Sequence, residues 1–152
     1  MKKILAVVCA ALLALCCVLP AIAESEPVDL IQYLGADPDT VGPELGLEKT
    51  LTEGEDGAEL TSYDSDDISL AGKEGKIINI TLFGGNYCLC GVTVGMTEDD
   101  AKAALDAAGI AYEDDEIAEI EAPVITFTIE GYEDLTGSFT LEDGVVTEGS
   151  IA

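Results

Sequence analysis

Gly91-Val-Thr-Val-Gly-Met-Thr-Glu-Asp-Asp-Ala-Lys-Ala-Ala-Leu-Asp-Ala-Ala-Gly109 is the stretch of sequence that decides the fold. It predicts a helix, because Thr97 is a good N-cap and Asp100 stands three residues later, as in a short capping box. The three acids after Thr97 place negative charge at the positive end of the helix dipole. Small apolar residues recur at helical spacing, and Gly109 is a typical helix stop. We therefore expect a helix between Thr97 and Gly109 that packs closely on a sheet.

Strand patterns lie on both sides of this helix. The segment 68–83 predicts a hairpin with its turn at 72–75, and its second arm is rich in β-branched residues. Residues 124–130 form the clearest strand of the chain. Near the end, Asp143-Gly144 is a strong two-residue hairpin signal that leads into a returning strand over 145–151.

Other segments give weaker signals. Residues 28–34 carry apolar side chains at helical spacing, and 36–47 predicts turns with at most short helical segments. The pattern of 87–94 predicts a strand. Residues 113–121 predict an acidic connection between strands, and 53–57 a polar loop.

Two halves of the chain share one pattern, a helical segment followed by antiparallel strands. This order favours an α+β fold over a parallel α/β sheet. We expect residues 1–23 to be a signal peptide and 24–152 to form a single α+β domain. Its two related units would span approximately 28–86 and 87–152.

A short motif at the start of the predicted helix carries a resemblance to a known family. Gly95-Met-Thr97, followed by Ala101 and Leu105, resembles the Gly-Met-Thr-x-x-x-Ala/Val-x-x-x-Leu signature of small exported proteins. These are similar to the β-lactamase inhibitory protein and to the small lipoprotein of the outer-membrane barrel-assembly machine. The resemblance covers about twenty residues. It implies a helix-plus-antiparallel-sheet unit that binds other proteins and performs no chemistry.

The N-terminus reads as an export signal. Lys2 and Lys3 precede an apolar run, Pro20 breaks it, and Ala21-Ile-Ala23 provides the small-x-small pattern for cleavage. We expect the mature chain to be secreted or held in the cell envelope, without membrane insertion. An alternative is a lipid anchor, for which the lipidated residue is Cys16 or Cys17.

The charge balance restricts the partners. The formal net charge is −25, with 31 acidic residues against six basic ones and no histidine. Nucleic acid is excluded, because binding to phosphates needs clustered Lys or Arg. An anionic membrane surface is disfavoured for the same reason. The acids provide solubility, or a field that attracts divalent cations or a basic protein.

Two cysteines remain once the signal is removed, at Cys88 and Cys90. Three interpretations stay open for them. The two cysteines could be small apolar residues on a buried strand face, a disulfide or thiol pair, or part of a metal site. Regular strand geometry places their Cα atoms about 6.5–7 Å apart. A disulfide between them therefore requires a turn at Leu89.

Candidate chemistry is sparse. Without histidine no serine has an obvious base, so we expect no catalytic residues and no enzyme activity. Carboxylates cluster at Asp64, Asp66 and Asp67, and again over 113–116. Calcium takes several such oxygen ligands, but neither cluster has the glycine and distal glutamate of an EF-hand loop. We expect no other cofactor.

The sequence therefore predicts a secreted, acidic, non-enzymatic interaction domain. It would bind another extracellular protein, of basic character, through a sheet face or a hairpin edge. The alternative is a surface protein that binds divalent cations, with calcium as the first candidate.

Overall fold

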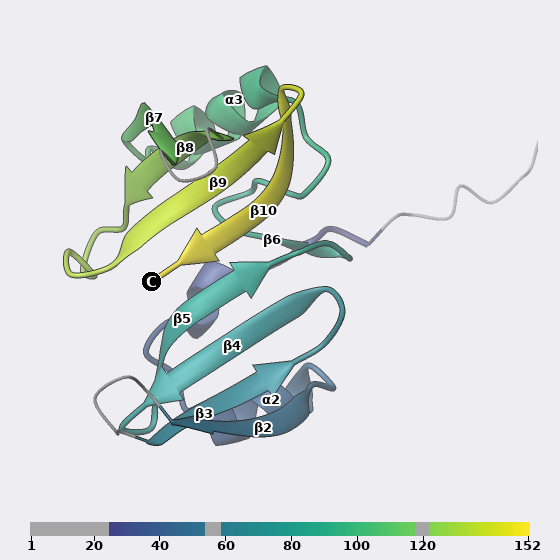
Figure 1. Cartoon of the computed structure of the whole chain (residues 1–152), viewed down its shortest axis with the longest axis vertical. Helices are drawn as coiled ribbons and strands as arrows, with labels where there is room; N and C mark the ends of the chain where they lie inside the picture. Colours follow the sequence, from purple (N-terminus) through teal and green to yellow (C-terminus); the bar gives the residue numbers. More distant parts are fainter. Residues whose placement is uncertain (1–24, 54–58, 118–121) are drawn as a thin grey trace, which may run out of the picture.

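An eight-stranded antiparallel sheet is the main feature of the computed structural model, which describes residues 25–53, 59–117 and 122–152 (Figure 1). The strand order is β2-β3-β4-β5-β10-β9-β8-β7. The strands are β2 (Glu48–Glu53), β3 (Glu59–Asp64), β4 (Ile68–Lys73), β5 (Lys76–Leu82), β7 (Tyr112–Ile117), β8 (Ala122–Thr128), β9 (Thr136–Glu142) and β10 (Val145–Ile151). The α+β class predicted from the sequence is confirmed.

The described helices lie on one side of this sheet. They are the 3-10 helix η1 (Leu30–Tyr33), α2 (Pro38–Glu44) and α3 (Glu98–Ala108). Helix α2 contacts β2, β3 and β4, whereas α3 contacts β10, and Figure 1 shows both behind the sheet. A small parallel sheet of β1 (Val28–Asp29) and β6 (Tyr87–Cys88) joins the start of the described chain to its middle.

The strand order is symmetrical about the β5–β10 pair, because each half of the chain supplies four consecutive antiparallel strands after a helix. The hairpins beside this axis share one register. In the first, Glu74-Gly75 forms the turn, with φ of 54° and 74°, and Ile78 is the extra residue of a bulge. In the second, Asp143-Gly144 forms the turn, with φ of 52° and 75°, and Thr147 is the extra residue. Positive φ at both turn residues is the type I′ geometry that suits twisted hairpins.

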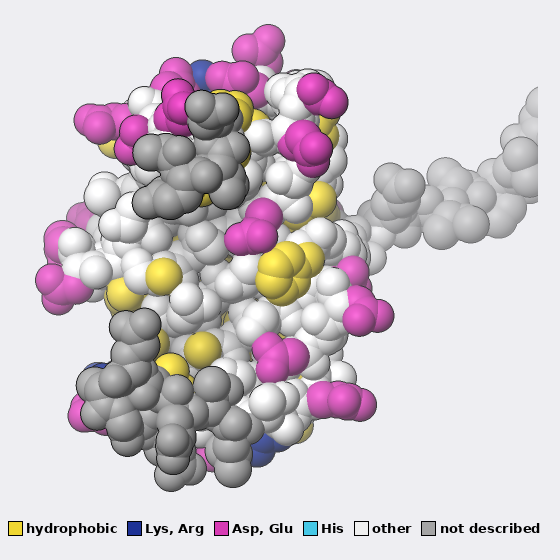
Figure 2. Space-filling view, in the orientation of Figure 1, with side chains coloured by type: hydrophobic (Ala, Val, Ile, Leu, Met, Phe, Trp, Pro, Cys, Tyr) yellow, Lys and Arg dark blue, Asp and Glu magenta, His cyan; other side chains and the backbone are white. Residues whose placement is uncertain are grey.

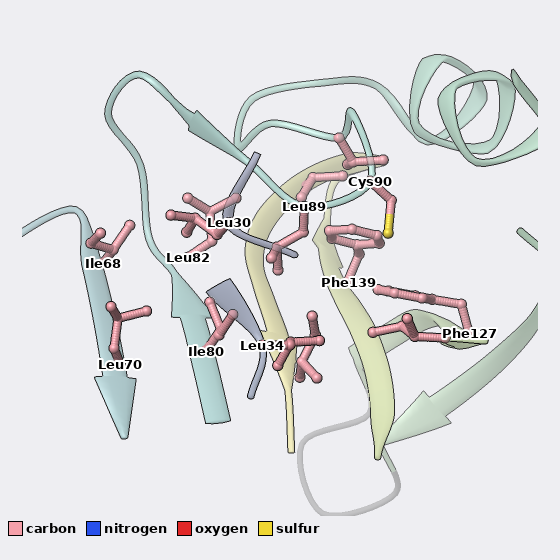
Figure 3. Close-up of a cluster of buried hydrophobic side chains, with 14 of the residues drawn as sticks. Leu30, Leu34, Ile68, Leu70, Ile80, Leu82, Leu89, Cys90, Phe127 and Phe139 are labelled. Atoms are coloured by element: carbon pink, nitrogen blue, oxygen red, sulfur yellow. The ribbon is translucent and has the colours of Figure 1, made fainter. Parts of the chain in front are cut away.

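The core lies between the sheet and the helices. Figure 3 shows side chains from η1, β4, β5, β8, β9 and the 89–90 turn gathered in one cluster. Phe127 and Phe139 stack within it, with ring centroids 5.0 Å apart. Gly137 provides the space, because a Cβ there would lie 2.2 Å from the Phe127 ring. A larger residue at 137 would therefore displace the aromatic pair.

Helix α3 is confirmed with its predicted cap and stop. The Thr97 hydroxyl oxygen accepts a hydrogen bond from the Asp100 backbone N–H, at 3.3 Å. Gly109 adopts the left-handed conformation, with φ of 72°. Ala101 and Leu105 are fully buried, so this part of the small-residue stripe faces the sheet as expected, whereas Ala108 at its end is exposed. Hairpins β4–β5 and β9–β10 and strand β8 are likewise where the sequence predicts them.

Three of the weaker expectations need correction. Within 36–47 a regular seven-residue helix forms, because Asp37 caps it and Pro38 occupies the first turn, where a missing N–H costs nothing. The expected strand over 87–94 ends at Cys88, because the chain reverses at Cys90 and Gly91. Residues 30–33 are helical, but as a 3-10 turn.

The two edge strands differ from the sequence prediction. The sequence gives no strand signal over Glu48–Glu53, and 113–117 is an edge strand, not an acidic connection. Backbone hydrogen bonds to one neighbour are enough to order an edge strand, so its side chains need no apolar alternation. Strand β7 has four exposed acids in succession, and charge at a sheet edge discourages pairing with another chain. The predicted polar loop falls largely in 54–58, outside the described residues.

Candidate functional site

The face of the sheet opposite the helices is the surface best placed to bind another molecule. We call it the open face. Successive side chains of a strand point to opposite faces, so every second residue lies here. Strand pairing aligns one residue from each of the eight strands into a central row. In strand order the row is Glu48, Asp64, Ser69, Thr81, Ser150, Ser138, Thr126 and Glu113.

The central row is neutral in the middle and acidic at its ends. Its five inner members all carry hydroxyl groups, and they are only partly buried. Ser138 Oγ and Ser150 Oγ lie 2.9 Å apart, within hydrogen-bond distance. Figure 2 shows this face as mostly uncharged, with most acidic side chains toward its periphery. An uncharged polar centre with an acidic rim suits a partner that carries hydrogen-bonding groups and positive charge.

An exposed aromatic residue lies beside the central row. Phe83 follows the end of β5 and is 46% exposed. Because Leu82 pairs with Gly149, the next position places Phe83 opposite Glu148 of β10. The Phe83 backbone N–H donates to the carbonyl oxygen of Asp67, at 2.7 Å, which places Asp67 on its other flank. Figure 2 shows an apolar patch near the end of β5 with an acidic group on either side.

The three predicted calcium ligands do not converge. Asp64 accepts a hydrogen bond from the Ser69 hydroxyl, while Asp67 packs against Gly85 at the end of the β4–β5 pair. Across the described ranges, no group of three or more His, Cys, Asp and Glu side chains is arranged to hold a metal ion. Calcium binding therefore stays a prediction without a site in the described part of the chain.

The acids of β7 divide between the two faces. Asp114 points to the helix side, where Lys102 of α3 lies 2.8 Å from it and 2.7 Å from Glu98. Hydrogen bonds from Lys102 to Asp114 and Glu98 raise the pKa of its ammonium group. Glu113 alternates to the other side and ends the central row. Within the run over 113–116, Asp114 thus binds the helix, whereas Glu113 lies at the rim of the open face.

The first half has the same attachment with the charges exchanged. Lys49 of β2 binds Asp39 of α2 at 2.6 Å, and Tyr63 donates a hydrogen bond to the same carboxylate at 2.8 Å. The Lys49 hydrogen bond, followed by that of Tyr63, lowers the pKa of Asp39. In both halves an ion pair therefore ties the edge strand to the helix beneath it, which leaves these lysines on the helix side.

Cys88 and Cys90 are both free and buried. Cys90 has φ of 53° in a tight turn closed by reciprocal hydrogen bonds between Leu89 and Val92, of 3.0 and 2.9 Å. Burial, and then the negative charge of Asp29, raises the pKa of Cys90 to about 12. In Figure 3 the Cys90 sulfur points toward Phe139 and Phe127, inside the core. Neither thiol is available as a nucleophile in this arrangement.

Sequence reasoning did not find the open face as a site. The signal was present as Ser or Thr in alternation with apolar residues along β4, β8 and β9. Only strand register shows that these hydroxyls share one face. A further finding concerns the helices: none in the described ranges is long and apolar enough to cross a membrane.

Solved structures of secretory proteins share this fold. An extracellular protein containing a SCP domain, from Bacillus anthracis str. Ames, aligns with 88% of this chain at a TM-score of 0.54 and 9% identity. A cysteine-rich secretory protein from Staphylococcus aureus subsp. aureus Mu50 aligns with 83% at a TM-score of 0.53 and 10% identity. The likeness is one of fold. The chain matches less than half of either protein, 48% and 45% of their lengths.

The resemblance to the β-lactamase inhibitory protein and the barrel-assembly lipoprotein is therefore wrong. The two structures described above are of an extracellular protein containing a SCP domain and of a cysteine-rich secretory protein. The Gly95-Met-Thr97 motif and the small residues after it indicate only where a helix begins, and unrelated folds use the same signals. No protein-family model and no curated protein matches the sequence.

Proposed function

We propose that this protein is a secreted, non-enzymatic domain that binds a basic extracellular protein through its open face. The observation that carries the proposal is the open face itself, a sheet surface with neutral hydroxyls at its centre and acids at its ends. Hydroxyls on a preformed sheet offer hydrogen bonds with little loss of conformational entropy.

Charge supports a basic partner. The net charge of −25 attracts a cationic protein over long distance and speeds their association. Lys49 and Lys102 are engaged in ion pairs on the helix side, so they do not oppose this attraction at the open face. The same charges repel a second copy of this chain.

Export is supported by two independent observations. The predicted signal peptide lies in residues 1–23, outside the described ranges, and it stays a prediction. The two structural neighbours are described as extracellular or secretory proteins. A lipid anchor at Cys16 or Cys17 would place the same binding face at the cell envelope.

Binding through the face is favoured over binding through an edge. A partner that adds a strand needs a free edge with accessible backbone groups. Both edges here carry acids, as Glu48 on β2 and the run over 113–116 on β7. Charged edge strands are a common protection against strand addition.

The test is affinity capture from the native extracellular milieu with three immobilised proteins. They are the unaltered chain, Thr81→Lys at the centre of the open face, and Ala107→Lys on the exposed side of α3. Both variants change the net charge equally. We expect a basic protein to bind the unaltered chain and Ala107→Lys, and to be lost with Thr81→Lys.

Two results contradict this function. One is an empty eluate from the unaltered chain at physiological salt. The other is a captured protein that both lysine variants retain or lose equally, since that protein would respond to net charge alone. Thermal unfolding of each variant establishes that the comparison is made between folded proteins.

A further inference from the structure

We propose that Phe83, Glu148 and Asp67 form a subsite of the open face that binds an arginine side chain of the partner. This inference rests on the proposed function and names the chemistry of its main contact. Asp67 precedes β4 and Phe83 follows β5, and the strand registers place Phe83 between Asp67 and Glu148 of β10.

Phe83 has no structural role that accounts for its exposure. Large apolar side chains exposed in the described ranges are Ile78, Phe83 and Tyr132. Ile78 is the extra residue of a bulge, and the Tyr132 hydroxyl donates to the Leu34 carbonyl oxygen at 2.8 Å. Phe83 is the most exposed of the three, at 46%. Its side chain is therefore free to contact a partner.

Phe83 has no aromatic counterpart at the equivalent position in the second half of the sheet. The two central hairpins share one register, so Phe83 at the end of the first corresponds to Ala152 at the end of the second. The hydroxyl residues repeat in both halves, as Ser69 with Ser138 and Thr81 with Ser150. The aromatic residue appears once, so the two ends of the β5–β10 pair differ.

The flanking carboxylates have no cation of their own in the described part of the chain. Lys49 pairs with Asp39, and Lys102 pairs with Glu98 and Asp114, so these two lysines are engaged on the helix side. Glu148 is partly buried at the neighbouring position of β10. A cation that lies over the Phe83 ring would meet Glu148 on one side and Asp67 on the other.

Arginine fits this arrangement better than lysine. Its guanidinium is planar and weakly hydrated, so it stacks on an aromatic ring and still donates to carboxylates at its edges. An ammonium group is compact and strongly hydrated, and it gains less from the ring. The subsite therefore predicts a preference for arginine in a basic partner.

The test is a titration with tri-arginine and tri-lysine peptides, followed by NMR shifts of the Phe83 ring. We expect tri-arginine to bind several-fold more tightly and to shift the ring signals. Phe83→Leu keeps an apolar side chain without the π face, and should weaken tri-arginine binding by about threefold. Glu148→Gln should weaken it too, whereas the matched Glu133→Gln in the exposed β8–β9 connection should not.

Equal binding of the two peptides, with no effect of Phe83→Leu, would overturn the subsite. That result differs from failure of the proposed function. If Thr81→Lys loses the captured protein while Phe83→Leu retains it, the open face binds without an arginine subsite. If neither variant affects capture, the open face itself is not the binding surface.

Discussion

At the scale of single residues, the fold buries some polar groups in the core and exposes others on the open face. Cys90 is an example of a buried group, since its thiol lies in the core beside two phenylalanines and the residue is only 5% exposed. Ser138 and Ser150 are examples of exposed groups, since their hydroxyls form a hydrogen bond with each other on the open face. Alternation along β9 and β10 places the two serines on the open face, whereas the tight turn at Cys90 directs its thiol into the core.

The buried Cys90 thiol predicts a loss of stability at alkaline pH. Its pKa is about 12 in the folded protein and about 8.5 in an unfolded chain. The unfolded state therefore loses its proton first, and the contribution of this thiol to stability is full below about pH 8.5 and falls as the pH rises toward 12. Denaturant unfolding at pH 8 and pH 10 measures the decrease.

The control for this prediction is Cys90→Ala. Tyr63, whose pKa burial also raises, titrates in the same range, so the comparison is between the pH slopes of the two proteins. The unaltered chain should show the steeper decrease. Identical slopes would mean that the Cys90 thiol ionises as readily in the folded protein as in the unfolded one.

Tyr132 connects the two halves of the molecule through one hydrogen bond. Its hydroxyl donates to the Leu34 carbonyl oxygen of the first half, at 2.8 Å. Tyr132→Phe should lower the free energy of unfolding by about 1 kcal/mol, the usual contribution of such a bond. Tyr33→Phe is the matched control, because the Tyr33 hydroxyl makes no hydrogen bond within the described ranges. Equal effects of the two changes in chemical denaturation would contradict this assignment.

At the scale of elements, local signals decide which parts can be predicted from sequence. Helix α3 has its N-cap, its acids, its apolar stripe and its C-terminal glycine within one segment. The hairpin turns at Glu74-Gly75 and Asp143-Gly144 are similarly local. Strands β2 and β7 have no such signal, because an edge strand is ordered by pairing with a neighbour distant in sequence.

The cap of α3 gives a prediction at this scale. Thr97→Ala removes the acceptor for the Asp100 N–H, and should lower the free energy of unfolding by about 1 kcal/mol. Thr97→Ser retains the hydroxyl and should restore most of that loss. Thermal and denaturant unfolding measure both variants. A Thr97→Ser protein as unstable as Thr97→Ala would mean that the hydroxyl is not the stabilising group.

At the scale of the whole molecule, two similar halves form one continuous sheet. The sequence indicates the repeat, since a helix followed by strands occurs twice, but not the strand order. The halves join through the pairing of β5 with β10, two strands that are far apart in the sequence. This pairing aligns eight side chains into the central row. The candidate site therefore could not be found before the register was known, although each of its residues was visible in the sequence.

The halves differ where binding is proposed. Polar hydroxyls occupy equivalent positions in both halves, while Phe83 and Glu148 lie opposite each other at one end of the β5–β10 pair. The ion pairs that fix the edge strands lie on the opposite side of the sheet, with their charges exchanged. One side of the sheet thus stabilises the fold, and none of the described helices covers the open face.

Site-specific photo-cross-linking tests this account most directly. A photoreactive amino acid is placed at Thr81 in the central row, and a second protein carries it at Ala107 on the outer side of α3. Both proteins are exposed to the native extracellular milieu and irradiated. We expect one basic protein to be cross-linked from position 81 and none from position 107. Cross-links from position 107 alone, or equally from both, would contradict it.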